Sequence, residues 1–117
     1  MNRVLILEDE PLIAMDLSMA FEDCAIAAVT AVTCAEASTA LAEQAIDGAV
    51  LDVNLGQETS VPLAKELRRL GIPFIAVSGY SATQLPDEFE GVPLIGKPMN
   101  FNILFDQLGK VLSPGAE

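Results

Sequence analysis

The chain has 117 residues and a hydrophobic content of 51%, which suits one domain over residues 1–117 with a core that needs no disulfide. Its net charge of −11, with only six Lys and Arg residues, disfavours direct contact with nucleic acid, because phosphate contacts need basic side chains. No apolar run is long enough to cross a membrane and the N-terminus does not resemble a signal peptide, so we expect a cytoplasmic protein without a membrane partner.

The chain has no histidine, which excludes Ser-His-Asp hydrolysis and catalysis by a histidine acid or base. Two cysteines without histidine do not make a zinc site. We therefore expect Cys24 and Cys34 to be small buried side chains.

Five apolar runs alternate with helical patterns along the chain. The runs cover residues 4–7, 26–32, 49–51, 74–77 and 92–95. Continuous rather than alternating apolar character is typical of strands that are covered on both faces. The pattern predicts an α/β fold, a doubly wound parallel sheet of five strands with helices on both faces.

The first helix is expected to begin at Pro11, a favourable residue in a first turn. At helical spacing its buried face would carry Ile13, Leu17, Ala20, Phe21 and Cys24.

Four more helical segments are expected. The second covers residues 35–45, and the third covers residues 61–70 and ends at Gly71. The fourth, residues 81–90, contains Pro86 and has little periodicity, so it should be weak or short. The last runs from an Asn100 cap to Leu112 and should bury Phe101, Leu104, Phe105, Leu108 and Val111.

Polar groups with complementary chemistry follow four of the five runs. Glu8 and Asp9 follow the first run, Asp52 the third, Ser78 the fourth, and Lys97 comes shortly after the fifth. In an open parallel sheet, ligands bind beyond the carboxyl ends of the strands, where these groups should meet. Three carboxylates, a hydroxyl and an ammonium group together predict a site for a divalent cation and a phosphoryl group.

Mg²⁺ suits this set, because it prefers oxygen ligands and is usually bound by one or two carboxylates, waters and phosphate oxygens. We expect Asp9 and Asp52 to bind the ion directly and Glu8 to act through a coordinated water. The backbone carbonyl of Asn54 is a further candidate ligand.

Asp52 is also a candidate nucleophile, because carboxylates form aspartyl-phosphate intermediates. The metal and Lys97 would offset the repulsion between the carboxylate and the incoming phosphoryl group. The Ser78 hydroxyl would donate a hydrogen bond to a phosphoryl oxygen.

Over its whole length the chain resembles a response-regulator receiver domain of two-component signalling. Glu8 and Asp9 match the acidic pair of that family, Asp52 its phosphoacceptor, Ser78 its Thr or Ser, and Lys97-Pro98 its Lys-Pro pair. The run from Pro73 through Phe-Ile-Ala-Val-Ser-Gly to Tyr80 is similar to the Phe-Ala-Thr-Gly-Tyr variant among small alphaproteobacterial receivers. The resemblance implies the strand order 2-1-3-4-5.

Two residues depart from the usual pattern of the family. Leu94 stands where most receivers have a Tyr or Phe that reports phosphorylation, and Gly56 stands where a Pro is typical. Tyr80 is then the nearest aromatic residue that could respond to the modification.

A second apolar stripe, formed by Leu12, Met15 and Met19, lies away from the core face of the first helix. It is either incidental surface or a partner-binding surface, since Met side chains suit adaptable contacts. The resemblance implies that a histidine kinase or a histidine phosphotransfer protein docks there.

The resemblance thus implies a non-enzymatic single-domain response regulator that catalyses only its own phosphorylation and dephosphorylation. It would use Mg²⁺, accept a phosphoryl group from phosphohistidine onto Asp52, and signal to a downstream protein or act as a phosphate sink. A receiver-like adaptor that works without phosphorylation, a phosphatase with an Asp nucleophile, and a receiver cut from a longer protein are the alternatives. Against the phosphatase, Asn54 stands where such enzymes have a second acid.

Overall fold

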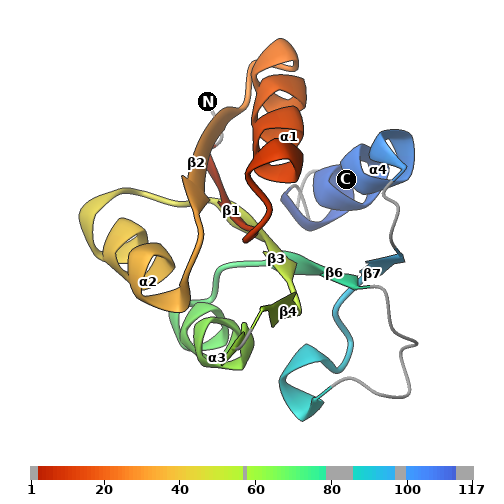
Figure 1. Cartoon of the computed structure of the whole chain (residues 1–117). Coiled ribbons are helices and arrows are strands. Elements are labelled where there is room, and N and C mark those ends of the chain that lie inside the picture. Colours follow the sequence, from red (N-terminus) through yellow and green to blue (C-terminus); the bar gives the residue numbers. More distant parts are fainter. Residues whose placement is uncertain (1–2, 57, 79–85, 97–99, 113–117) are drawn as a thin grey trace.

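Five parallel strands form the centre of the structure, a computed structural model that describes residues 3–56, 58–78, 86–96 and 100–112. The strands are β1 (Arg3–Leu7), β2 (Ala27–Ala31), β3 (Gly48–Asp52), β6 (Phe74–Ser78) and β7 (Leu94–Gly96). They pair in the order β2-β1-β3-β6-β7 (Figure 1). The predicted α/β fold and the order 2-1-3-4-5 are therefore confirmed.

Helices cover both faces of this sheet. Helices α1 (Pro11–Asp23) and α4 (Phe101–Leu112) lie on one face, and α2 (Cys34–Glu43) and α3 (Val61–Leu70) lie on the other (Figure 1). Alternate residues of a strand pack against the helices on opposite faces of the sheet, because successive side chains of a strand point to opposite faces. Along β1, Val4 and Ile6 pack with the α1 and α4 residues, whereas Leu5 and Leu7 pack with those of α2 and α3.

Local signals explain where most helices begin and end. The Asn100 carboxamide accepts hydrogen bonds from the backbone N–H groups of Asn102 and Ile103, so the predicted cap of the last helix is confirmed. Gly71 ends α3 with φ of 72°, a conformation that favours glycine. Thr33 caps α2 by accepting a hydrogen bond from the Glu36 N–H, as in a Thr-x-x-Glu capping signature. The helix therefore begins at Cys34, one residue before the predicted start.

The second strand differs from the prediction. The apolar run over residues 26–32 suggested a strand covered on both faces, but β2 spans only Ala27–Ala31 and lies at the edge of the sheet. Thr30 is exposed and most of the strand is only half-buried. Its Ala-rich sequence looks like a continuous apolar run, but alanine has only a small side chain to bury.

Cys24 is exposed, which contradicts its predicted burial, whereas Cys34 is half-buried. Helix α1 ends at Asp23, and the next turn takes Ala25 to a positive φ of 62°. The helical spacing that placed Cys24 on the buried face therefore stops just before this residue. The prediction is confirmed for the other residues of that face, because Leu17 and Phe21 are buried and Ile13 and Ala20 are half-buried.

A short hairpin was not anticipated, whereas a weak or short fourth helix was. An antiparallel hairpin of β4 (Asn54–Leu55) and β5 (Glu58–Thr59) follows β3. The described part of the predicted fourth helix contains a 3₁₀ helix, η2 (Asp87–Phe89), which agrees with the expectation of a short element there. None of the described helices is long and apolar enough to cross a membrane.

Candidate functional site

Three carboxylates meet at the carboxyl edge of the sheet, as predicted. Glu8 and Asp9 follow β1, and Asp52 is the last residue of β3. One carboxylate oxygen from each of the three lies within 4.8 Å of the others. Glu8 and Asp52 are buried, and Asp9 is half-buried.

The sheet determines where Asp52 lies. All five residues of β3 are buried, and β3 is paired with β1 on one side and β6 on the other, so its last residue has little freedom. After it, the Val53 N–H donates to the Val77 carbonyl and the Asn54 N–H donates to Asp52 Oδ1, at 3.0 and 3.3 Å. The phosphoacceptor candidate is thus held in a fixed frame.

Ser78 is buried at the end of β6, the strand next to β3. Asp52 pairs in register with Val77, the residue just before Ser78. The structure therefore brings Ser78 to the same edge of the sheet as the carboxylates.

Two predicted site residues, Lys97 and Tyr80, lie outside the described part of the chain. Gly96, which directly precedes Lys97 in the sequence, pairs with Ser78. The assignment of Lys97 and Tyr80 to the site stays a prediction.

The hairpin β4–β5 forms one wall of the carboxylate site. Gly56, in its turn, has φ of 66°, which explains why glycine occupies this position. A Cβ atom on Gly56 would lie 3.5 Å from Asp9 Oδ2, so the turn passes directly beside the acidic pair. Asn54, whose carbonyl is a candidate ligand, is the first residue of the same hairpin.

A bound cation would offset the repulsion among these three carboxylates. Like charges at this separation repel, and burial weakens the screening by water. Two buried and one half-buried carboxylate, all oxygen donors, match the preference of Mg²⁺.

The apolar stripe on α1 is exposed as expected. The exposed fractions are 73% for Leu12, 52% for Met15 and 58% for Met19. Met15 and Met19 also line a groove of about 360 Å³ between α1 and β2, and this groove reaches Glu8. The stripe is therefore next to the carboxylate site.

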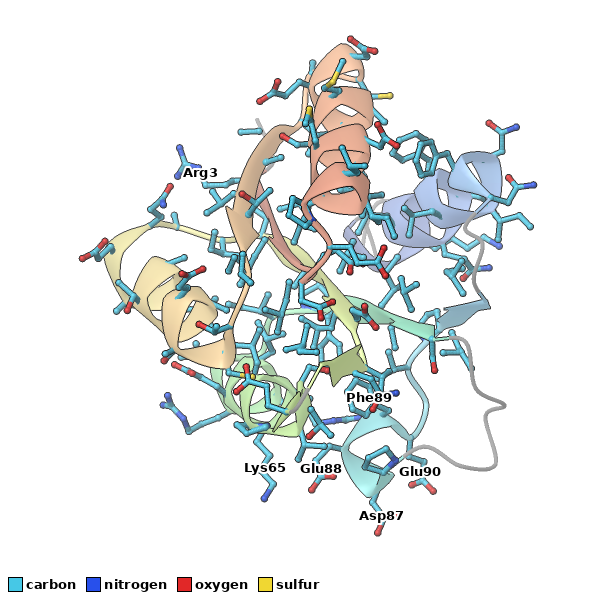
Figure 2. All side chains as sticks on the ribbon, viewed as in Figure 1. Arg3, Lys65, Asp87, Glu88, Phe89 and Glu90 are labelled. Atoms are coloured by element: carbon cyan, nitrogen blue, oxygen red, sulfur yellow. The ribbon has the colours of Figure 1, made fainter. Side chains whose placement is uncertain are left out.

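A second region of interest surrounds η2, below the sheet edge in Figure 2, where Glu88, Phe89 and Glu90 are labelled. The guanidinium group of Arg68 on α3 donates to the carbonyls of Glu88 and Glu90 at 2.8 and 2.6 Å. Phe89 is buried and stacks edge-on against Phe74 of β6. These contacts attach η2 to α3 and to the sheet.

Some residues of the site were missed by reasoning from the sequence. Ser60 is completely buried, and both its N–H and its hydroxyl donate to the Val53 carbonyl, next to Asp52. Gly56 was noted only as a departure from a family pattern. A glycine between two short polar stretches was the available signal for its turn, but two-residue strands carry no periodicity.

Comparison with known proteins agrees with this geometry. The family described as response regulator receiver domain matches residues 4–107. No curated protein sequence matches significantly. Among solved structures, the chain is similar to SdrG from Sphingomonas melonis Fr1, with 37% identity over 96% of this chain and 97% of that one and a TM-score of 0.81.

Two more distant structures share the fold. TrrA from Thermotoga maritima, solved in complex with Mg²⁺-BeF, has 23% identity, a TM-score of 0.83, and 95% and 99% coverage of this chain and of that one. A receiver domain protein from Methanospirillum hungatei JF-1 has 22% identity, a TM-score of 0.88, and 97% and 95% coverage. On the family match, on the 37% identical relative and on the acidic cluster at the sheet edge, this chain belongs to the response regulator receiver domain family.

Proposed function

We propose that this receiver domain accepts a phosphoryl group from a phosphohistidine onto Asp52, with Mg²⁺ at the acidic cluster, and signals through protein contacts. The observation that carries the proposal is the meeting of the Glu8, Asp9 and Asp52 carboxylates within 4.8 Å. Ser78, at the end of the adjacent strand, adds a hydroxyl to the same edge.

The transfer forms one bond and breaks one. A carboxylate oxygen of Asp52 forms a bond to phosphorus, the phosphorus–nitrogen bond breaks, and the imidazole nitrogen keeps the electron pair. Bound Mg²⁺ would supply positive charge against the phosphoryl oxygens. Asp9 and Asp52 would hold the ion directly, with the Asn54 carbonyl as a further ligand and Glu8 acting through water.

Lys97 and Ser78 would complete the site by binding the transferred group. An ammonium group offsets the charge of the phosphoryl oxygens, and a hydroxyl donates a hydrogen bond to one of them. The residues from Pro73 to Ser78 and the following Gly-Tyr support placement in the Phe-Ala-Thr-Gly-Tyr variant of the family.

The proposal is tested by incubating the protein with a small phosphodonor, with Mg²⁺ or with a chelator, and measuring the intact mass. We expect one added phosphoryl group per chain, and only with Mg²⁺. Sustained hydrolysis of a generic phosphate ester would point to a phosphatase instead. Binding to a partner with no phosphoryl uptake from any donor would point to a phosphorylation-independent adaptor.

Mg²⁺ itself should stabilise the fold. A ligand that binds the native state and not the unfolded state stabilises the native state by about 2.7 kcal/mol when the ligand concentration is a hundred times the dissociation constant. Thermal melts with and without millimolar Mg²⁺ should therefore differ clearly, and Asp9→Ala should remove most of the difference. An unchanged melting temperature in the wild type, or an equal rise in Asp9→Ala, would contradict the metal assignment.

The output surface is expected over residues 80–90 and the last strand. Phosphorylation adds about −1.5 to −2 charge and new acceptor oxygens, which should draw Ser78 toward them. Leu94 has no polar ring to respond and packs as a half-buried aliphatic residue against the core. A pocket of about 240 Å³ lies between Leu94 and the η2 residues, so this region has room to repack.

Backbone NMR of the free and the beryllofluoride-bound protein tests this surface. We expect chemical-shift changes through residues 80–90, including η2, as well as around Asp9 and Asp52. Changes that stop at the immediate neighbours of the carboxylates would rule out this switch and favour a phosphate sink.

A further inference from the structure

Glu58 lies on the hairpin that borders the carboxylate site, but its side chain turns away toward helix α2. Its Oε1 accepts a hydrogen bond from the backbone N–H of Cys34 at 3.0 Å. Cys34 is the first residue of α2, where backbone N–H groups lack partners within the helix. A carboxylate is well suited to this position, because the helix dipole favours negative charge at this end.

A second bond joins the same two elements. The Cys34 thiol donates to the Thr59 carbonyl, with Sγ and oxygen 3.3 Å apart. Burial, and then the negative charge of Glu58, raises the pKa of the Cys34 thiol above its ordinary value. The thiol therefore keeps its proton at neutral pH and stays a donor.

The hairpin held in this way borders the metal ligands. Its first strand begins two residues after Asp52 and contains Asn54. Its Gly56 turn lies beside Asp9 Oδ2. Thr59 pairs with Asn54 and Glu58 pairs with Leu55, so the strand bound to α2 is directly paired with the strand that contains the candidate ligand Asn54.

We propose that Glu58 is a positioning residue, which fixes the β4–β5 hairpin against helix α2 and so keeps Asn54 and the Gly56 turn in place around the cation. The inference rests on the proposed Mg²⁺-dependent phosphorylation of Asp52. It adds a residue that touches neither the metal nor the phosphoryl group and acts through the backbone of its own hairpin.

Variants on both sides of the bond separate positioning from charge. Glu58→Ala removes the acceptor. Glu58→Gln removes the charge but keeps an oxygen that can accept from the Cys34 N–H. Cys34→Pro removes the N–H donor while the Glu58 charge stays, and proline is well tolerated at the first position of a helix. Cys34→Ala keeps the N–H and removes only the thiol, so it is the control for Cys34→Pro.

The measurements are the melting temperature without any phosphodonor and the rate of phosphorylation by a small phosphodonor, each as a function of Mg²⁺ concentration. Partners that orient ligands typically contribute tenfold to a hundredfold in metal affinity, and we expect Glu58→Ala and Cys34→Pro to raise the half-saturating Mg²⁺ concentration roughly tenfold. The rate at saturating Mg²⁺ should stay near that of the wild type. Glu58→Gln should behave like the wild type, and Cys34→Ala, which keeps the N–H and loses only the weaker thiol bond, should lose much less than Cys34→Pro. The Glu58→Ala/Cys34→Pro double variant should be no worse than Cys34→Pro alone.

Glu43→Ala is the charge-matched control, because Glu43 is exposed at the other end of α2. Circular dichroism without Mg²⁺ checks that each variant is folded. An equal loss in Glu58→Gln and Glu58→Ala, or a normal Mg²⁺ dependence in Glu58→Ala and Cys34→Pro, would overturn the positioning role while wild-type phosphorylation still supports the proposed function. A wild type that takes up no phosphoryl group at any Mg²⁺ concentration would overturn both.

Discussion

Replacing Asp52 by Asn is expected to reduce phosphoryl uptake to background, with a small phosphodonor and with a kinase alike. The carboxamide keeps the shape of the side chain but is not a competent nucleophile. Asp52 is buried at the end of β3, between two paired strands, and its acidic neighbours Glu8 and Asp9 follow a different strand. Label transfer to the wild type and to Asp52→Asn, measured side by side, tests the assignment.

The folded state of Asp52→Asn must be shown, because a buried residue is changed. Removing one of three neighbouring negative charges relieves repulsion, so we expect this variant to melt no lower than the wild type without Mg²⁺. Full labelling of a folded Asp52→Asn protein would mean that another residue accepts the phosphoryl group.

Replacing both Met15 and Met19 by Glu is expected to slow phosphotransfer from a histidine-containing donor protein about tenfold or more. A minority of interface residues, clustered near the centre, contribute more than about 1 kcal/mol each, and a carboxylate buried there without a partner adds a further cost. About 1.4 kcal/mol corresponds to a factor of ten. Both side chains are more than half exposed and line the groove that reaches Glu8. The rates of transfer from the donor protein and from a small phosphodonor provide the comparison.

The small phosphodonor should label this variant almost as fast as the wild type, and the melting temperature should change little. The neutral pair Met15→Gln and Met19→Gln separates lost contact from added charge. Leu70→Glu, at an exposed apolar residue ending α3, controls for a new charge elsewhere on the surface. Equal losses with both donors would show that the stripe serves the fold rather than docking.

The strands that hold the site could be predicted because their burial leaves a clear mark on the sequence. Every residue of β3 and β6 is buried, and both read as continuous apolar runs that end in Asp52 and Ser78. Parallel strands end at one edge, so the meeting of Glu8, Asp9, Asp52 and Ser78 followed from the strand assignment alone. The burial of the edge strand β2 was harder to predict, because Ala counts as apolar in the sequence whether it is buried or half-exposed.

The contacts that support the site could not be predicted in the same way. The partner of Glu58 is a backbone N–H group 24 residues away, and neither residue type nor spacing indicates such a pair. Cys24 was misplaced because helical spacing says nothing about where a helix ends. The burial of Ser60 depends on the path of the hairpin, which is set by Gly56 and by the packing of Leu55 in the core.

The most direct test of the central claim is to identify the residue that carries the phosphoryl group. The protein would be phosphorylated with a small phosphodonor and Mg²⁺, reduced with borohydride, which converts an aspartyl phosphate into homoserine, digested, and mapped by mass spectrometry. We predict a single converted residue, at position 52, and none when Mg²⁺ is chelated. Conversion at position 9 instead, or an acid-stable phosphate on Ser78, would contradict the account.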